Sequence, residues 1–284
     1  MTTTSAQTSP TAPPGRSAPP AAVRASRTGR LLALARAELI LLVRNKTALF
    51  NAVVLAPGLV AFLALVGGNF FGNDPATAAA SIVATLLGIA LLMVVYYNLT
   101  TTFVARREEL VLKRLITGEV TRPEIVMAYA FPGLLITLAQ LALGYGAAAL
   151  LLEPVAVQNA LWLLAALAGG TAVFALLAVA SSGLTRTVET AQLTTMPMLG
   201  IAMLFSGFTL PLQLMPDVVS QVASWTPLHP VVALVQHGFG TMRPDGTVAS
   251  GDLVDVAQPL ACLAVWALIG LAATRRWMRW EPRR

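Results

Sequence analysis

Six long stretches without a formally charged side chain constrain the fold of this chain more than any other feature. None contains Asp, Glu, Lys or Arg, and they lie within 47–67, 79–105, 125–152, 157–183, 191–210 and 256–274. Because about 20 helical residues cross a hydrocarbon core of roughly 30 Å, each stretch is long enough to span a membrane. With 56% hydrophobic and 11% charged residues, the composition also differs from that of soluble domains. The sequence therefore predicts an all-α membrane protein with six transmembrane helices.

A seventh uncharged stretch, 218–242, is interrupted by Pro227 and Pro230 and is expected to enter the membrane only partly. At its start, Val218, Val222 and Trp225 share one helical face opposite polar residues, which is typical of a short helix at the membrane surface. His229 and His237 lie here, but this spacing without a nearby Cys or Glu does not indicate a metal site. We therefore predict no metal ligands in this chain.

The distribution of Lys and Arg predicts the orientation. Eighteen of the 19 fall on one side of the six predicted spans, and only Arg243 falls on the other. Since basic residues stay on the cytoplasmic side, both termini and the segment 106–122 are expected to face the cytoplasm. The net charge of +6 follows from this topology, so no nucleic acid is expected as a partner, whereas the basic rim suits a lipid bilayer with anionic headgroups.

The regions outside the spans also have distinct compositions. Residues 1–27 are rich in Pro, Ala and Ser and are predicted to be a disordered cytoplasmic tail, and 275–284 is a basic cytoplasmic tail. The segment 28–46 places leucines on one helical face and Arg36 and Arg44 on another, which is typical of an interfacial helix. The alternative is that it extends the first span.

The segment between the second and third spans, RREELVLKRLITGEVTRPEI, is the most highly charged part of the chain, with nine charged side chains among twenty. Residues 108–117 predict a short helix with an apolar face and a Glu109–Lys113 ion pair, ended by Gly118. Thr121 and Glu124 then form a capping-box pattern, which predicts the start of a second helix. A helix, a tight turn and a helix would make a rigid docking element, and a hairpin without a partner is the alternative.

Several chemical signatures are absent from the sequence. No phosphate-binding loop occurs, because neither Lys46 nor Lys113 follows a glycine-rich segment. No predicted span carries an ionisable residue that could relay protons, and no protease or hydrolase motif is present. We therefore expect no catalytic residues, no enzyme activity of the chain alone and no cofactor within it, so the energy for any transport must come from a partner.

Three elements in order resemble the type-2 ABC exporter permeases, a class that includes drug-resistance and polysaccharide exporters. They are the interfacial helix before the first span, VARREELVLKRLITGEVTRPEI after the second, and MLFSGFTLPLQLMP followed by TPLHP after the fifth. The resemblance covers nearly all of 28–280. It implies that 28–46 is a connecting helix, 106–118 a coupling helix and 211–240 an outer re-entrant region. Members often carry Gly-Thr after the acidic pair, where this chain has Leu110 and Val111.

The resemblance implies a permease subunit of the bacterial plasma membrane that works as a dimer with two separate ABC ATPase subunits. The second permease subunit could be identical or different, and ATP and Mg would be bound by the ATPase. The residues expected to couple to the ATPase are Glu108, Glu109, Lys113, Arg114 and Arg107. Arg36, Arg44 and Lys46 are expected to help position it.

The uncharged spans favour export of a lipophilic or amphipathic compound, such as an antibiotic or other drug, a peptide or a lipid-like molecule. Polar, Met and aromatic residues within the spans are the candidates for its pathway: Asn51, Asn98, Gln140, Thr194, Thr195, Met196, Met198, Met203 and Phe205. Ordinary helix packing is the alternative role for each. Polysaccharide export ranks second, since only 7% of residues are aromatic. A membrane scaffold or immunity protein that does not transport is the alternative from another class.

Overall fold

The computed structural model describes most of the membrane domain. The described residues are 27–44, 46, 50, 54, 56–66, 75–117, 120–151, 156–207, 215–241, 252–278 and 280. Nearly all of the predicted disordered tail 1–27, together with Asn51, Gly118 and most of the region 207–215, lies outside them. The predictions for those residues therefore stay predictions.

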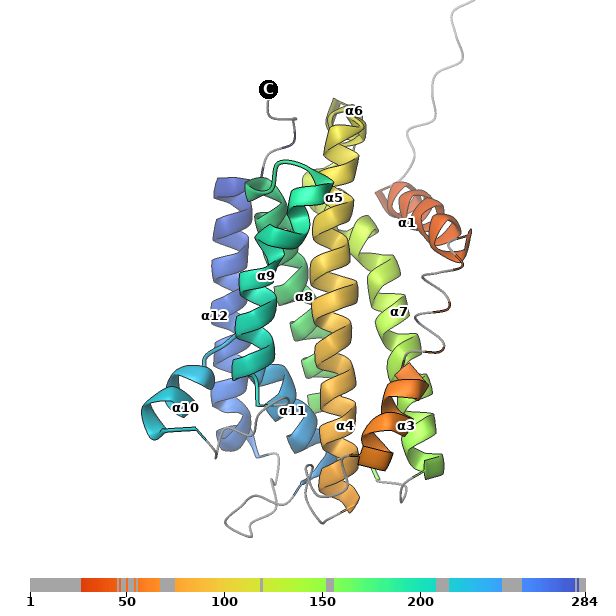
Figure 1. The fold of residues 1–284 in the computed structure, drawn as a ribbon. Helices are drawn as coiled ribbons and strands as arrows, with labels where there is room; N and C mark the ends of the chain where they lie inside the picture. The colour runs from red at the N-terminus through yellow and green to blue at the C-terminus, as the bar shows by residue number, and fades with distance from the viewer. Residues whose placement is uncertain are drawn as a thin grey trace, which may run out of the picture.

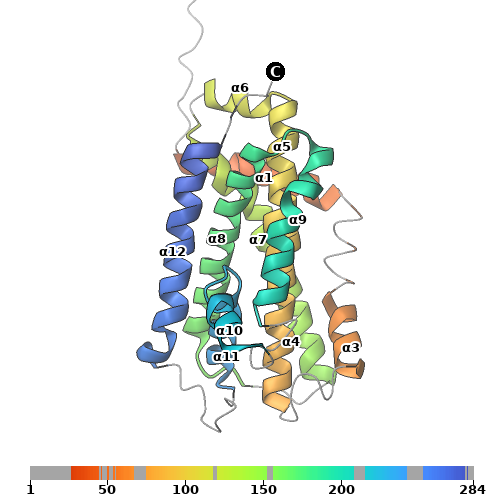
Figure 2. The same cartoon turned by 60° about the vertical axis from the view of Figure 1, so that its left-hand side comes forward.

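All regular secondary structure in these ranges is helical. The elements are α1 (Arg27–Arg44), α3 (Ala56–Val66), α4 (Pro75–Ile89), η2 (Ala90–Tyr97), α5 (Asn98–Glu108), α6 (Val111–Thr117), α7 (Arg122–Leu151), α8 (Ala160–Leu184), α9 (Val188–Phe205), α10 (Asp217–Ala223), α11 (His229–Phe239) and α12 (Leu253–Trp277). The long helices form a bundle (Figure 1). Helix α6 lies at one end of it, and α10 and α11 lie near the other (Figures 1 and 2).

Four helices are long and apolar enough to cross a membrane: Ala80–Glu108, Arg122–Leu151, Ala160–Leu184 and Leu253–Trp277. They coincide with the second, third, fourth and sixth predicted spans. The longest described helix in the first predicted span is α3, with 11 residues, and the fifth span corresponds to the 18-residue α9. The chain is therefore an all-helical, multi-pass protein, and six remains the predicted number of spans.

The helix Ala80–Glu108 is the central element of the bundle. In its most apolar window 72% of the residues are buried, compared with 28% in the corresponding windows of α7 and α12. It contains a π-helical stretch, Ala90–Tyr97, after which the Asn98 backbone N–H donates to the carbonyl of Met93. Wider turns of this kind are uncommon and often occur at functional sites. No pattern in the sequence predicted it.

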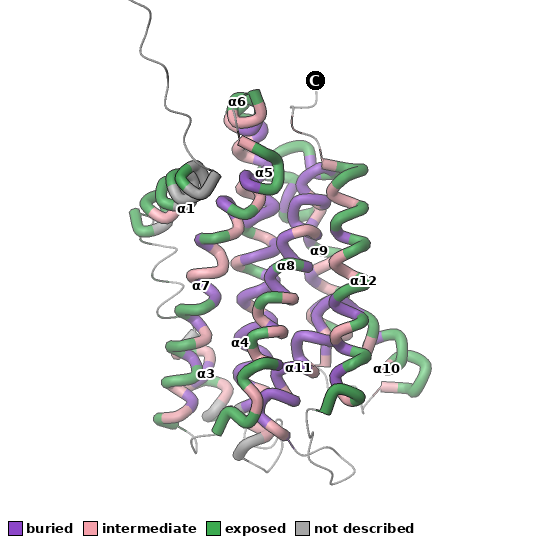
Figure 3. Tube along the Cα trace, turned by 180° about the vertical axis from the view of Figure 1, so that it is seen from behind, coloured by how far each residue is buried: buried purple, intermediate pink, exposed green. Residues whose placement is uncertain are grey.

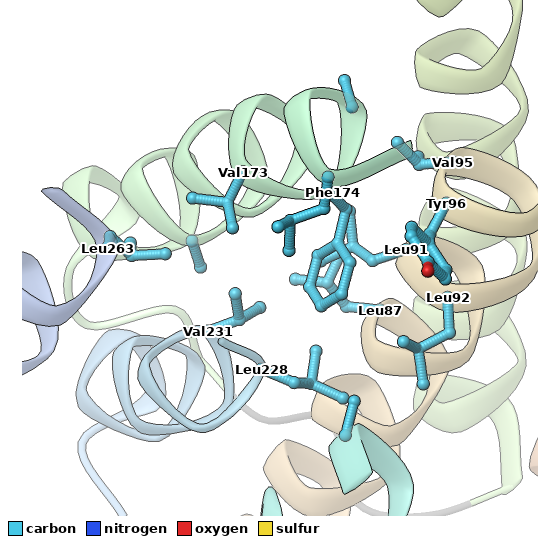
Figure 4. Packing of buried hydrophobic residues seen from close by; sticks show 14 of the residues in the cluster. Leu87, Leu91, Leu92, Val95, Tyr96, Val173, Phe174, Leu228, Val231 and Leu263 are labelled. Atoms are coloured by element: carbon cyan, nitrogen blue, oxygen red, sulfur yellow. The ribbon is translucent and has the colours of Figure 1, made fainter. Parts of the chain in front are cut away.

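The core lies between this central helix, α8, α11 and α12. Figure 4 shows Phe174 of α8 between Leu91 and Tyr96 of the central helix and Leu228 and Val231 near α11. The rings of Tyr96 and Phe174 meet edge to face, with centroids 6.3 Å apart. Figure 3 colours the chain by burial and shows that the buried residues lie mainly inside the bundle and the exposed residues on its outer faces. The outer faces carry many large apolar side chains, which fits a bilayer as the surrounding solvent.

Helix α11 is enclosed by protein at the end of the bundle opposite α6. Eight of its residues are buried, and it packs against α8, α4 and α12. It ends at Gly240, whose φ of 62° is the left-handed conformation that closes many helices. A broken, partly inserted helix needs its free backbone groups covered by protein or water, and here protein encloses it.

Helix α1 packs against α7 near the α6 end and lies obliquely to the bundle axis (Figure 1). Arg36 and Arg44 are exposed, and Leu39 is partly buried. This arrangement agrees with an amphipathic helix that is separate from the bundle. Its position at a membrane interface remains a prediction.

Helices α8 and α12 approach one another closely at two glycines. A Cβ atom on Gly183 would overlap the carbonyl oxygen of Trp277, and one on Gly270 would lie 2.9 Å from the Cβ of Leu176. Small residues let helix backbones approach in this way, which gives dispersion contacts that lipid cannot replace. The end of α12 is thereby held against the end of α8.

The turn between α5 and α6 contains a strained residue. Leu110 has a φ of 60°, and it is the one non-glycine residue with positive φ among those described. Its backbone N–H donates to the carbonyl of Arg107 at 3.1 Å, as at a left-handed helix C-terminus. Side chains in this conformation cost about 1–2 kcal/mol, so glycine would be favoured. The turn also places the start of α6 at Val111, whereas the sequence predicted a helix from residue 108.

We predict that Gly183→Ala destabilises the protein by about 1–3 kcal/mol, since a backbone carbonyl must move to admit the new methyl group. Gly146→Ala in α7 is the control, because nothing lies within 4 Å of its added Cβ. Thermal unfolding of both variants in detergent measures the difference. Equal melting temperatures for the two would contradict the close α8–α12 contact.

We predict that Leu110→Gly raises the melting temperature, because glycine adopts the left-handed conformation without strain. The free energy of unfolding should rise by at most about 1 kcal/mol, since glycine also increases the entropy of the unfolded chain. Val111→Gly is the control, since Val111 begins α6 and glycine there lowers helix stability. Opposite shifts are expected in the same thermal assay. A loss of stability in Leu110→Gly would show that the left-handed turn does not form.

Candidate functional site

The end of the bundle that carries α6 collects the basic residues. The elements that meet there are the ends of α5, α8 and α12 and the starts of α7 and α9 (Figures 1 and 2). The basic side chains on these elements are Arg106, Arg107, Lys113, Arg114, Arg122, Arg186, Arg275 and Arg276. The sequence assigned all of them to one side of the membrane, and the structure places them at one end. That this end faces the cytoplasm stays a prediction.

The charged segment contains the two predicted helices, α6 and the start of α7, while the predicted turn at Gly118 lies outside the described residues. Leu112 of α6 is fully buried, and Leu115 and Ile116 pack against the core. This is the apolar face that the sequence predicted. Helix α6 is therefore anchored to the bundle by one side only.

The start of α7 confirms a further prediction. The Thr121 backbone N–H donates to a carboxylate oxygen of Glu124 at 2.9 Å, which is the reciprocal half of a capping box. Glu124 and Ile125 are buried. Beside them, the guanidinium of Arg122 lies 5.6 Å from the ring centre of Trp280, which is a cation–π distance. The second helix of the hairpin is therefore firmly held.

The residues predicted to contact an ATPase fall into two groups. Glu108, Glu109, Lys113 and Arg114 are exposed around the α5–α6 turn and on α6, where a partner could reach them. Glu109 forms an ion pair with Arg106 at 3.1 Å. Glu109 lies in the turn before α6 and not in the short helix in which the sequence placed it.

Arg107 differs from the other four predicted coupling residues in its surroundings. Only 2% of it is exposed, so it does not present its charge to a partner in this structure. Its guanidinium donates to the carbonyls of Ser182 at 2.9 Å, Thr185 at 2.6 Å and Arg186 at 3.2 Å. Arg107 is buried there because the carbonyls at the end of α8 have no helical partners and accept hydrogen bonds from a cation.

The candidate pathway residues are not on one surface. Asn98 and Met196 are exposed, Thr194, Met198, Met203 and Phe205 are partly buried, Gln140 and Thr195 are buried, and Asn51 lies outside the described residues. The Thr194 and Thr195 hydroxyls donate to backbone carbonyls of their own helix at 3.0 and 2.9 Å. Helix α9 contacts α5 and η2, so Asn98 and the exposed side of α9 belong to neighbouring elements. Gln140 lies on α7.

The central helix and α8 are also joined by polar contacts that sequence analysis missed. The Tyr96 hydroxyl lies 2.9 Å from the Ser181 hydroxyl, and the Thr100 hydroxyl lies 3.3 Å from the Ala178 carbonyl. Each partner is more than 75 residues away in the chain, so no local spacing reveals the pairs. The unusual number of hydroxyl groups in an apolar span was the available signal.

At the opposite end, the two histidines have different surroundings. The Nδ1 atom of His229 lies 3.1 Å from the Ser206 carbonyl, and His237 is buried within α11. Over the ranges that the structure describes, no group of three or more His, Cys, Asp and Glu is close enough to hold a metal ion.

Comparison with known proteins agrees with this architecture. The family model described as ABC-2 type transporter matches residues 29–239, which include the hairpin and all of the described elements from α3 to α11. No curated protein matches the chain. Since the match covers most of the sequence, the chain belongs to the ABC-2 type transporter family of membrane proteins.

Proposed function

We propose that this chain is the permease subunit of an ATP-driven exporter, in which two permease subunits work with two separate ATPase subunits. Membership of the ABC-2 family supports a transporter component that acts in the bilayer together with an ATPase. The observation that carries the proposal is the hairpin at the end of the bundle. Its Leu112 is buried against the bundle, while Glu108, Glu109, Lys113 and Arg114 are exposed. ATP and Mg would be bound by the partner.

The proposed topology has six spans, with 47–67 and 191–210 completing the four that qualify by length. The basic end would face the cytoplasm of a bacterium, since Lys and Arg are retained on that side. Both termini would then lie inside, the helix 28–46 would lie at the inner interface, and α10 and α11 would lie at the outer side. In this orientation the hairpin meets the compartment that supplies ATP.

Energy would enter through the hairpin. The predicted spans carry no Asp, Glu, Lys or Arg, so a movement imposed at the end of the bundle is the available driving force. ATP binding would draw the ATPase subunits together and move the two hairpins, which favours an outward-open over an inward-open arrangement of the spans. The cargo is exported because its affinity differs between these two states.

The position of Asn98 supports a second permease subunit. It is seven residues inside the end of the predicted span 79–105, or about 10 Å at 1.5 Å per residue, so it lies within the hydrocarbon core. An exposed amide at that depth is unfavourable in lipid. We therefore infer that the exposed sides of α5 and α9 face a second permease subunit and a pathway between the two. Met196 would lie beside that pathway.

A lipophilic or amphipathic cargo fits these surroundings best. The exposed candidates are uncharged, and methionine adapts to ligands of different shapes. An antibiotic or other drug, a peptide or a lipid-like compound could enter such a pathway from the inner leaflet. An exporter of this kind would confer resistance to its cargo.

The docking role of the hairpin predicts a specific loss of partner. The double variant Lys113→Glu and Arg114→Glu should reduce the amount of ATPase recovered with the tagged chain by roughly tenfold or more, which corresponds to about 1.4 kcal/mol. Reversed charges repel the surface that wild-type charges attract. The control is Arg275→Glu with Arg276→Glu, which makes the same charge change on exposed residues at the same end.

The measurement is mass spectrometry of the proteins that co-purify from native membranes, with a search for an ATPase that carries a phosphate-binding lysine. Recovery of the ATPase should be normal with the control. Equal losses in both double variants would argue against docking by the hairpin. If no ATPase accompanied the wild-type chain, the proposed function itself would fail.

The proposed pathway predicts water at Asn98. Asn98→Cys should react with a water-soluble maleimide at least about tenfold faster than Leu268→Cys, because the reactive thiolate forms in water and not in lipid. Leu268 is the control, since it is 66% exposed on α12 and is expected to face lipid. The native Cys262 is buried and gives little background. Equally slow reactions at both positions would remove Asn98 from the pathway.

A further inference from the structure

Arg107 binds the end of a helix that lies 75 residues further along the chain. The three carbonyls that accept its hydrogen bonds belong to the last turn of α8 and to the α8–α9 connection, at Ser182, Thr185 and Arg186. Hydrogen bonds from an ionised donor are shorter and stronger than neutral ones, and two guanidinium nitrogens share these acceptors. The contact is buried, so water does not compete for it.

The arrangement of the helices explains why a cation is placed here. The connectivity and Figure 1 show that α5 and α8 run in the same direction and that both end at the α6 side. Their carbonyl ends carry partial negative charge and lie close together, which is unfavourable. The guanidinium of Arg107 lies at this point and offsets both helix ends.

The same two helices are joined further along their length. The hydroxyl groups of Tyr96 and Thr100 contact Ser181 and Ala178 of α8, and the rings of Tyr96 and Phe174 pack against each other. Together with the hydrogen bonds of Arg107, these contacts join the central helix to the C-terminal half of α8 and to the connection that follows it. They should therefore move as one body.

The hairpin begins directly after this contact. Arg107 is followed by Glu108, the last residue of α5, and by the short turn into α6. On the other side of the contact, α8 continues through Thr185 into α9, which starts with a capping box between Thr187 and Thr190. The two backbones that meet at Arg107 thus lead to the hairpin in one direction and to α9 in the other.

We propose that Arg107 is a positioning residue that fastens the coupling hairpin to the α8–α9 connection, so that a pull on α6 displaces α8 and the start of α9 together with α5. This inference rests on the proposed function, because it assumes that a partner moves the hairpin. It replaces the expected role of Arg107 as an ATPase contact. It also explains how movement at α6 reaches α9, which carries six of the candidate pathway residues.

The test measures whether the hairpin and the α8–α9 connection keep a fixed separation. Spin labels are attached at Thr117→Cys, at the end of α6, and at Arg186→Cys, whose side chain is exposed while its carbonyl still accepts from Arg107. Distances are recorded by pulsed electron resonance for the full chain in lipid nanodiscs with its ATPase, without nucleotide and with ATP and vanadate. The variants are Arg107→Met and Arg107→Lys, and the matched control is the neighbouring Arg106→Met.

The unsubstituted Arg107 should give one narrow distance that is the same in both nucleotide states. Arg107→Met should broaden the distribution without nucleotide and shift it when ATP is added, because the hairpin then moves without α8. Arg107→Lys keeps the charge with fewer donors and should restore part of the fixed distance, whereas Arg106→Met should behave as the unsubstituted chain. A role limited to stability would lower the amount of folded protein and leave the distance in the folded fraction unchanged.

Two results would overturn the proposal: a distance in Arg107→Met that equals the unsubstituted one in both states, or a distance that already changes with ATP when Arg107 is present. If Arg107→Met does not fold, the distances measured in Arg107→Lys are compared with those of the unsubstituted chain instead. If no ATPase binds the unsubstituted chain, the proposed function fails. The widths of the distance distributions without nucleotide then still test whether Arg107 holds the hairpin to the α8–α9 connection.

Discussion

The contact between the helix Ala80–Glu108 and α8 is the interaction on which the rest of the structure depends. Phe174 and the apolar side chains around it fill the space between these helices, and α11 and α12 complete the same core. Helices in a membrane gain little from the hydrophobic effect, so close packing and buried hydrogen bonds must hold them together. Both occur here, with glycines where α12 meets α8 and hydroxyl groups where the central helix meets it.

Helix dipoles determine which charged residues are favourable at the α6 end of the bundle. The helices α5 and α12 end at the α6 side with arginines in their last turns, and α7 and α9 begin there with Glu124 and Glu189 in their first turns. Each charge has the sign that stabilises the nearest helix end. The basic residues at this end therefore compensate the carbonyl ends of its helices, and in the proposed topology they would also orient the chain in the membrane.

Sequence reasoning succeeded where the signal was local. The Thr121 and Glu124 pair lies three residues apart and predicted the start of α7 correctly, and the spacing of Leu112, Leu115 and Ile116 predicted the buried face of α6. The long uncharged stretches predicted the four qualifying helices for the same reason. The exact start of α6 was wrong because Leu110 takes a left-handed conformation that side-chain propensity disfavours.

Sequence reasoning failed where the partner is distant. Arg107 stands among eight other charges in a polar segment, which indicated a solvent-exposed side chain. The carbonyls that bury it come from the end of a helix 75 residues away, and no pattern within the segment reports them. The π-helical stretch, which packs against α8 and α7, also has no signal in the local sequence. Under the proposed function, these distant contacts would determine how far a movement of the hairpin extends into the bundle, and local patterns in the sequence do not reveal them.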